Sequence, residues 1–272
     1  MINFLKGIIV GIGAIIPGLS GGVMLVIFGL YEKTVNSIST VFKNFKKSFF
    51  FLLPVALGVL TGVLLFSKVM KFFLENYEMY TRFLLFGLVL GAIPLFFKQV
   101  RKKGFNKTNY IIIAISIMFG VGLLFLSRGL FSEVTNPNIV QSVLLGVIVA
   151  TSIIVPGTDS AVLLSTVGLY KLYVDSLAGL NLSVLIPAAL GLGFGALIIS
   201  LIMSRLLKKY YSIVFSVIFG LFITIIPSIF TEACALGFNI QSAISIVLVI
   251  VGFFISYFLS KIEKNNEEKE EV

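Results

Sequence analysis

Six long apolar segments constrain the fold of this chain more than any other feature of its sequence. An α-helix that crosses the hydrocarbon core of a bilayer needs about 20 apolar residues, and these segments reach that length once flanking residues are included. They cover residues 49–67, 83–97, 110–126, 184–203, 213–230 and 243–259. Only 12% of the 272 residues are charged and 58% are hydrophobic, whereas soluble domains carry roughly a quarter charged residues. The sequence therefore predicts an all-α integral membrane protein.

Two further apolar segments, 7–31 and 141–170, differ from these six because a Pro-Gly pair interrupts each of them near its middle. The pairs are Pro17-Gly18 and Pro156-Gly157. Proline lacks the backbone donor that a helix interior needs, so each segment is expected to form two short helical limbs joined by a turn. Aligned without gaps, residues 7–31 and 146–170 share eleven identities in 25 positions. The two broken segments are therefore expected to be copies of one structural unit.

The likeness continues along the rest of the chain. The recurring positions are Pro54, Gly58 and Gly62 with Pro187, Gly191 and Gly195, and Phe86-Gly-Leu88 with Phe219-Gly-Leu221. The four glycines have the spacing that lets helices approach closely, so a packing role is expected for them.

This collinear repetition predicts two related halves, residues 1–138 and 139–260, followed by a charged tail at 261–272. Each half is expected to hold one broken segment and three plain helices. The helices are placed at about 49–70, 80–98 and 109–127, and at about 184–206, 211–230 and 240–260.

The distribution of Lys and Arg decides between two topologies for the halves. If both broken segments enter and leave the membrane on the same side, 16 of the 21 basic residues lie on the side of the termini. If both segments cross fully, the same residues divide 11 to 10. Because basic residues concentrate in cytoplasmic loops, the sequence favours re-entrant helical hairpins and an inverted-topology repeat. Both termini are then expected to be cytoplasmic.

The tips of the hairpins are the expected binding positions, because irregular backbone inside a membrane must be buried in protein or line a watery cavity. The first tip combines glycines that allow close backbone approach with a hydroxyl and free N–H groups, which suits a phosphate group. Its residues are Pro17, Gly18, Ser20, Gly21 and Gly22. The second tip keeps the turn and supplies two hydroxyl groups. Its residues are Pro156, Gly157, Thr158 and Ser160.

Asp159 stands in the second tip where the first tip has Ser20. An acid near the bilayer centre costs about 2.5–3.5 kcal/mol, so Asp159 is expected to be paired, protonated or functional. Two interpretations stay open: it caps the helical limb that follows, or it couples transport to protons or a cation. Glu32, after the first broken segment, is a second coupling candidate that could pair with Lys33 or with a bound cation.

Other side chains limit the chemistry that the chain can perform. Histidine is absent and Cys234 is the single cysteine, so no histidine-ligated metal, no cofactor and no intramolecular disulfide are expected. The formal charge of +9 comes from clusters between apolar runs, which indicate topology rather than nucleic-acid binding. Arg82 and Arg128 are expected on the outer side, where guanidinium groups could receive an anionic lipid.

The motif Gly-Ala-Ile-Ile-Pro17-Gly-Leu-Ser-Gly-Gly22, followed by Gly-Leu-Tyr-Glu32 and by a second copy ending in Gly-Leu-Tyr170, resembles the bacterial polyprenyl-phosphate transporter family. The similarity covers nearly the whole chain. It implies a translocase in the bacterial cell membrane that returns undecaprenyl phosphate, the lipid carrier of cell-wall precursors, from the outer to the inner leaflet. The hairpin residues of the family match Pro17, Gly18, Ser20, Gly21, Gly22 and Glu32 in the first copy, and Pro156, Gly157 and Ser160 in the second. Asp159 departs from the small or hydroxyl residues more usual in the family.

A non-enzymatic lipid-phosphate flippase is the leading interpretation, with a polyprenyl phosphate and the bilayer as partners and homo-oligomerisation left open. One alternative is a membrane phosphatase acting on a lipid pyrophosphate. It would need a nucleophile or base from Ser20, Ser160, Asp159 or Glu32, and neither tip carries the arginine expected beside the serine in undecaprenyl-pyrophosphate phosphatases. The other alternative is a transporter of a small soluble anion, which would require a closed aqueous path.

Overall fold

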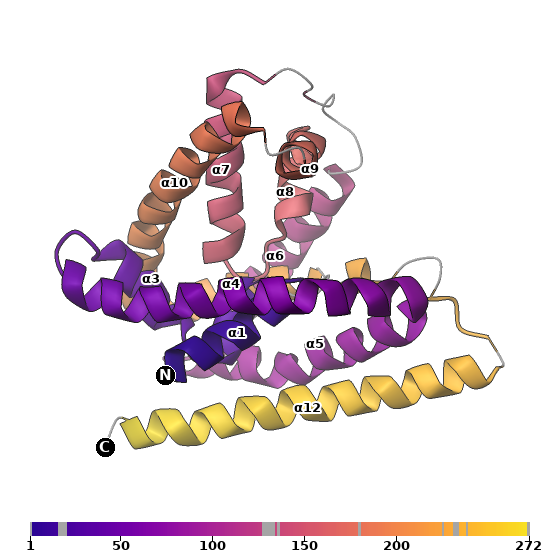
Figure 1. Ribbon diagram of the computed structural model, residues 1–272. Coiled ribbons are helices and arrows are strands. Elements are labelled where there is room, and N and C mark those ends of the chain that lie inside the picture. The colour runs from indigo at the N-terminus through magenta and orange to yellow at the C-terminus, as the bar shows by residue number, and fades with distance from the viewer. Residues whose placement is uncertain are drawn as a thin grey trace.

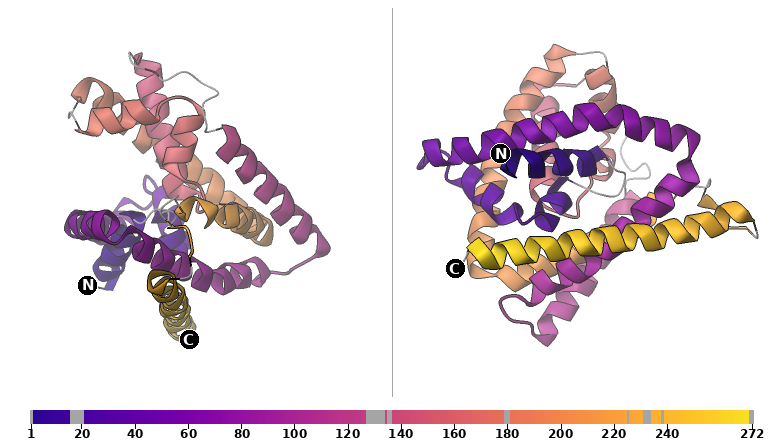
Figure 2. Two further views of the ribbon diagram at one scale, coloured as in Figure 1. Left: turned by 90° about the vertical axis from the view of Figure 1, so that its right-hand side faces the viewer. Right: turned by 60° about the horizontal axis from the view of Figure 1, so that its bottom comes forward.

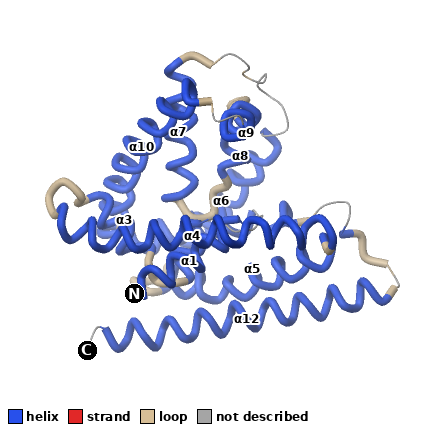
Figure 3. Tube along the Cα trace, in the orientation of Figure 1, coloured by secondary structure: helices blue, strands red, loops and turns tan. Residues whose placement is uncertain are grey.

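The computed structural model describes residues 2–15, 21–126, 134, 137–178, 181–224, 226–230, 234–237 and 239–270. Within those ranges the chain forms helices joined by turns and contains no strand (Figure 3). The first six helices are α1 (Ile2–Ile15), α2 (Gly21–Ile27), α3 (Tyr31–Ser39), α4 (Phe45–Asn76), α5 (Glu78–Arg101) and α6 (Lys107–Leu126). The next elements are α7 (Ile139–Ile154), α8 (Ser160–Thr166), α9 (Tyr170–Ala178), α10 (Leu182–Lys209), α11 (Tyr211–Thr224), the 3₁₀ helix η1 (Ile226–Ile229) and α12 (Ile240–Glu270).

Five helices in the described ranges are long and apolar enough to cross a membrane. The spans are Phe45–Phe66 in α4, Glu78–Arg101 in α5, Lys107–Leu126 in α6, Leu182–Lys209 in α10 and Ile240–Phe258 in α12. Many of their Leu, Ile and Phe side chains are exposed, which is a surface suited to lipid rather than to water. The expected all-α, multi-pass membrane protein is confirmed.

The one remaining expected span, placed at about residues 211–230, is not a single α-helix. α11 ends at Thr224, and η1 covers Ile226–Ile229. Pro227 lies in η1, and proline both lacks an N–H group and disfavours α conformation at the residue before it. Pro94 stands at the matching place in the first half, yet α5 continues through it. The two halves therefore differ in shape here.

The Pro-Gly interruption of the second broken segment is present as a turn between two short helices. α7 begins with a capping box in which Asn138 and Gln141 bond each other's backbone N–H groups. It ends at Ile154, and α8 begins at Ser160. In the first half, α1 ends at Ile15 and α2 begins at Gly21, and the tip between them, residues 16–20, lies outside the described residues.

Close helix contacts recur in the same register in both halves. α1 packs along α4, and α7 packs along α10. Glycine allows both contacts, because a Cβ would collide with the backbone of the neighbouring helix at three of the four positions and would lie only 3.0 Å from the Cα of Val147 at the fourth, Gly195. The contacts are Gly58 and Gly62 against Phe4 and Ile8, and Gly191 and Gly195 against Val143 and Val147. The predicted packing role of these glycines is confirmed.

Two further helix pairs join the halves to each other. α5 packs along α12, and α11 packs along α6. Gly87 of α5 lies against the carbonyl oxygen of Val249, while a Cβ at Gly220 of α11 would lie 2.8 Å from the carbonyl oxygen of Ile113. Between α5 and α11, the fully buried rings of Phe96 and Phe222 stack with centroids 4.5 Å apart. The interior therefore lies where the halves meet.

The helices run in two main directions. α1, α4 and α12 lie nearly parallel to one another, and α7 and α10 stand across them (Figure 1). The two views in Figure 2 show the same crossing from other sides. The Pro-Gly turn between α7 and α8 lies where the two directions cross.

Candidate functional site

The second Pro-Gly turn is fixed against α11. Gly157 has φ +84°, a left-handed conformation that favours glycine. A Cβ there would lie 2.7 Å from the amide nitrogen of Phe222 and 3.0 Å from the carbonyl oxygen of Ile218. The hydroxyl of Thr158 donates to the carbonyl oxygen of Val155 at 2.7 Å. Backbone shape, a close contact and a side-chain hydrogen bond therefore all stabilise the turn.

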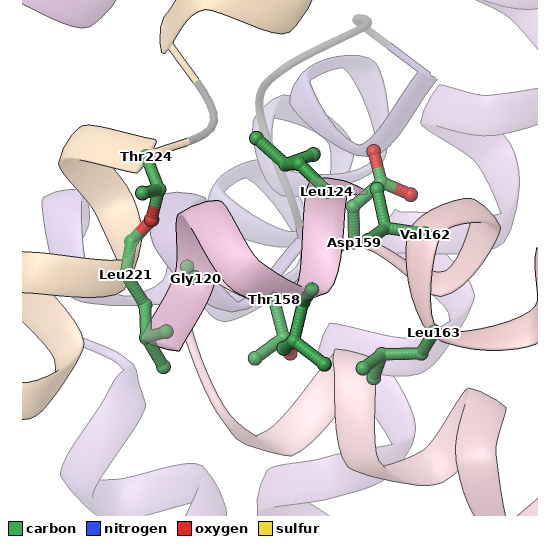
Figure 4. A pocket seen from close by; sticks show the side chains of 10 residues that line it. Gly120, Leu124, Thr158, Asp159, Val162, Leu163, Leu221 and Thr224 are labelled. Atoms are coloured by element: carbon green, nitrogen blue, oxygen red, sulfur yellow. The ribbon is translucent and has the colours of Figure 1, made fainter. Parts of the chain in front are cut away.

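A small pocket opens beside this turn, between α6, α8 and α11. It is lined by Gly120, Leu123, Leu124, Gly157, Thr158, Asp159, Val162, Leu163, Leu221 and Thr224. Figure 4 shows Asp159 and Leu163 on one side and Leu221 and Thr224 on the other. Its free space is about 20 Å³, which holds about one water molecule. The pocket is mostly apolar, with one carboxyl group and two hydroxyl groups among its lining residues.

The edge of the first break lies directly against the second. A Cβ on Gly22, at the start of α2, would lie 2.9 Å from the carbonyl oxygen of Ile153 and 3.1 Å from the Cα of Pro156. Gly22 and Pro156 are both buried. The structure thus brings together residues of the two tips that are 134 positions apart in the sequence.

Tyr31, at the start of α3, is joined to the same region. Its hydroxyl donates to the carbonyl oxygen of Ile154 at 3.0 Å, and its ring packs edge-on against Phe215 with centroids 6.2 Å apart. Tyr31 lies outside the five candidate spans, and burial followed by the nearby charge of Glu32 raises the pKa of its hydroxyl. The hydroxyl therefore stays protonated and donates to the last carbonyl of α7, which a helix end leaves without a partner inside the helix.

Glu32 bonds to a tyrosine of the second half. The hydroxyl of Tyr211 lies 2.8 Å from a carboxylate oxygen of Glu32 and 2.8 Å from the side-chain oxygen of Gln99. A tyrosine has one proton to donate, so a Gln99 amide turned the other way would donate to the tyrosine oxygen instead. The ammonium group of Lys103 lies 4.7 Å from the centre of the Tyr211 ring. This polar cluster joins α3, α5 and α11.

Arg82 is held at the start of α5. Its Nε donates to Glu78 at 2.8 Å, and its Nη1 donates to the carbonyl oxygen of Ile229 at 2.6 Å. These contacts connect α5 to η1, and Arg82 is not among the residues that line the pocket. Arg128, the other arginine expected to receive a lipid, lies outside the described residues.

The structure places part of the predicted site in one region. Gly157, Thr158 and Asp159 line the pocket, and Ser160 begins α8 directly after them. Gly21 and Gly22 begin α2, whereas Pro17, Gly18 and Ser20 lie outside the described residues. In the described part of the chain, no group of three or more His, Cys, Asp or Glu side chains could hold a metal ion.

Four of the polar residues described above were not expected from the sequence. They are Tyr31, Gln99, Tyr211 and Thr224. The sequence does contain a feature that points to Tyr31, because the Gly-Leu-Tyr that ends the first broken segment recurs at Gly168-Leu-Tyr170. Thr224 had none, since a threonine in an apolar run often bonds only to its own helix, and its hydroxyl does donate to the carbonyl oxygen of Leu221 at 2.6 Å.

Comparison with known proteins identifies relatives of this chain. A polyprenyl-phosphate transporter of Staphylococcus aureus is 27% identical over 278 aligned residues, which cover 98% of each chain. A polyprenyl-phosphate transporter of Vibrio cholerae is 24% identical over 209 residues, covering 72% of this chain and 66% of the relative. No solved structure matches the chain significantly. The family model described as VCA0040-like, undecaprenyl phosphate translocase-like, matches residues 10–244, so the chain belongs to that family.

Proposed function

We propose that this protein carries a polyprenyl phosphate, undecaprenyl phosphate, across the bacterial cell membrane. One observation carries the proposal: inside a multi-pass bundle, the start of the helix after the first break lies against the second Pro-Gly turn, where Gly22 contacts Pro156 and a pocket with polar groups opens beside the turn. A charged phosphate does not enter hydrocarbon unaided, because its desolvation is too costly. A polar site between helices lowers that barrier, and the name of both relatives agrees with this class of substrate.

The headgroup is proposed to bind at the two tips while the isoprenoid tail stays in lipid. Backbone N–H groups and hydroxyl groups there would replace the hydration shell of the phosphate. The residues are Pro17, Gly18, Ser20, Gly21 and Gly22 from the first tip, and Pro156, Gly157, Thr158 and Ser160 from the second. Arg82 and Arg128 are proposed to receive the lipid on the outer side. Arg82 can do so while bonded to Glu78, because a guanidinium group has five N–H donors.

The halves 1–138 and 139–260 are proposed to be inverted repeats with re-entrant hairpins at 7–31 and 141–170. Two packing features support this proposal. Helices α5 and α6 of the first half pair with α12 and α11 of the second, an exchange that a two-fold axis between the halves produces. The glycine contacts also recur in one register. Together with the excess of basic residues on one side, this arrangement makes both termini cytoplasmic.

Transport through this site requires the protein to change shape. A pocket of about 20 Å³ has room for a water molecule but not for a phosphate group. The residues that line the pocket must therefore move apart before a headgroup can enter. In inverted-repeat transporters, rocking of the two halves opens a central site to each side in turn, and we propose the same motion here.

The proposed direction is from the outer to the inner leaflet, which returns the carrier for the synthesis of cell-wall precursors. The proposed process is non-enzymatic, since moving the lipid requires no bond to be made or broken. Asp159 in the pocket and Glu32 beside Tyr211 are the candidates for coupling this movement to protons or another cation.

Reconstitution tests the function directly. Liposomes containing undecaprenyl phosphate are treated from outside with a water-soluble phosphatase, which reaches the outer leaflet only. We expect the inner-leaflet pool to be consumed when the protein is present and to stay protected in protein-free liposomes. Continued protection in liposomes with correctly inserted protein would contradict the proposal. Release of phosphate from undecaprenyl pyrophosphate by the protein alone would indicate the phosphatase instead, and uptake of inorganic phosphate would indicate the soluble-anion transporter.

A further inference from the structure

The helices that follow the two broken segments, α3 and α9, make unequal contacts. The gapless alignment of 7–31 with 146–170 makes α3 and α9 counterparts, and α4 and α5 are likewise the counterparts of α10 and α11. α3 packs along α10 in the other half and reaches α11 through Glu32 and Tyr211. In the described parts of these helices, α9 packs against α8 and α10 but not along α4 or α5. The second half therefore lacks the contact that α3 makes.

Burial of matching residues shows the same difference. Tyr31 and Val35 of α3 are each 2% exposed, whereas their counterparts Tyr170 and Val174 of α9 are each 43% exposed. Leu30 and Leu169, one position earlier, are each 2% exposed. The asymmetry is therefore confined to the face that α3 turns toward the opposite half, and it does not come from a general loosening of the second half.

The contacts of α3 define what α9 would touch in a mirrored arrangement. Tyr31 bonds the carbonyl oxygen of Ile154, Asn36 lies 3.4 Å from Ser204, and Glu32 lies 2.8 Å from Tyr211. Helices α3 and α9 each have 9 residues, so the shift of 139 positions extends from the broken segments through them, and the helices that follow are shifted by 133 positions. These two shifts give the matching pairs. They are Tyr170 with Ile15, Asp175 with Lys71, and Lys171 with Glu78.

These matching pairs are chemically complementary. A tyrosine hydroxyl again faces the last carbonyl of a broken limb, since Ile15 ends α1 as Ile154 ends α7. The polar pair Asn36 and Ser204 corresponds to the oppositely charged pair Asp175 and Lys71. The pair Glu32 and Tyr211 corresponds to Lys171 and Glu78, which also have opposite charges. Opposite charges attract only at short range in salt solution. The complementary charges of these two pairs are therefore useful to the protein only if α9 approaches α4 and α5.

We propose that α3 and α9 are two gates that close alternately over the central site, and that this structure shows the α3 gate closed and the α9 gate open. In the other state, Tyr170 bonds the end of α1, Asp175 pairs with Lys71 and Lys171 pairs with Glu78, while Tyr31 and Glu32 release their partners. The inference rests on the proposed inverted arrangement. With cytoplasmic termini, the α3 gate is the inner one, so the present state has its inner gate closed and its outer gate open, while the pocket itself is still narrow.

The two gates use different chemistry, which gives them different sensitivity to salt. The contacts of α3 are hydrogen bonds to a carbonyl, a serine and a tyrosine, and Tyr31 is buried. The contacts proposed for the closed α9 gate include two ion pairs, and salt screens the attraction within such pairs. Glu78 is also bonded to Arg82 in the present state, so closure of α9 places two cations around that carboxylate. High salt should therefore favour the state seen here.

Cross-linking tests for the second state in the full-length protein. In a Cys234→Ser background, one double variant carries Asn36→Cys with Ser204→Cys, and another carries Asp175→Cys with Lys71→Cys. Both are reconstituted in liposomes and treated with a short, reducible thiol cross-linker. We expect both pairs to cross-link, transport to be lost in each case, and reduction to restore it. Ser176→Cys with Lys71→Cys is the matched control, because Ser176 is buried on α9 and should not react.

The outcomes separate the gate from the function. Failure of Asp175→Cys to link to Lys71→Cys, in protein that still moves undecaprenyl phosphate, would overturn the gate and leave the function in place. Linkage of both pairs in protein that moves no lipid would support the gate and contradict the substrate. A charge exchange gives a second measurement: Asp175→Lys and Lys71→Asp should each lower transport, and the double variant should recover it. No recovery, with the singles well folded, would also contradict the paired gate.

Discussion

The hydroxyl of Tyr31 donates a hydrogen bond to the carbonyl oxygen of Ile154, 3.0 Å away and 123 residues along the chain. This bond joins the helix after the first break to the end of the helix before the second. Tyr31 is buried, and a buried carbonyl that loses its donor is left with no hydrogen-bond partner in place of water. This hydrogen bond therefore ties the two broken segments to one another, in addition to the packing of Gly22 against Pro156.

Tyr31→Phe is expected to destabilise the protein measurably. The ring and its packing against Phe215 are kept, but the buried carbonyl of Ile154 loses its donor, which costs about 1–3 kcal/mol. Thermal unfolding in detergent should show a lower midpoint. Tyr170→Phe is the matched control, because Tyr170 is half exposed in this structure, and its midpoint should not change. Equal midpoints for Tyr31→Phe and the unmodified protein would contradict the role of this bond.

Gly157→Ala should also lower stability, for a different reason. The residue has φ +84°, which costs a residue with a side chain about 1–2 kcal/mol, and its Cβ would press on the backbone at Phe222. Gly193→Ala in α10 should have the opposite sign, since a Cβ there meets nothing within 4 Å and alanine favours a helix by about 0.5–1 kcal/mol. Unfolding midpoints of the two variants that move in the same direction would contradict this account.

The helices of this protein are predictable from sequence where hydropathy alone determines them. The spans in α4, α5, α6, α10 and α12 follow from apolar length, because lipid requires every backbone group to be bonded within its own helix. The end of α11 is not predictable in this way. Pro94 and Pro227 stand at matching places, yet only α5 continues through its proline, so tertiary neighbours decide the outcome.

The candidate site was predictable only in part for a related reason. A Pro-Gly pair in an apolar run marks a break wherever it occurs, so the turn at Pro156 and Gly157 was expected. Its neighbours Gly120 and Thr224 come from α6 and α11, and nothing in their local sequence points to the turn. Their contribution depends on how α6 and α11 pack together, which is a long-range property of the fold.

The proposed topology predicts which loops can be labelled from outside the cell. Asn44, between α3 and α4, should be cytoplasmic, and Asn181, between α9 and α10, should face outward. Both side chains are exposed, so neither burial nor packing should limit the reaction. In a Cys234→Ser background, a membrane-impermeant thiol reagent added to whole cells should label Asn181→Cys and not Asn44→Cys. Equal labelling at both positions would rule out the inverted arrangement.

The first tip should tolerate loss of a hydroxyl better than loss of backbone access. Ser20→Ala removes one hydrogen bond to the headgroup, worth about 0.5–1.5 kcal/mol, or up to about 3 kcal/mol when the partner is charged, so transport should fall but remain. Gly21→Val places a branched side chain at the start of α2 and should abolish transport. Expression and unfolding midpoints are measured in parallel to detect misfolding. Normal transport by well-folded Gly21→Val protein would place headgroup binding elsewhere.

Asp159→Asn separates the two interpretations of the acid in the second tip. Asp159 lies directly before α8 and accepts a backbone bond from Leu163 at 3.0 Å, so it stands where a helix cap would be, and it also lines the pocket. Asparagine keeps the size and the capping ability of aspartate but cannot change its charge.

A cap alone predicts that the Asn variant retains both its stability and its response to a pH gradient. A coupling acid predicts that stability is kept while a gradient no longer accelerates transport. Protonation on the outer side would remove repulsion between the carboxylate and the incoming phosphate, and deprotonation inside would help to release it. We expect the second result in liposomes compared with and without a pH gradient. An unchanged gradient response in the Asn variant would leave Asp159 with a structural role.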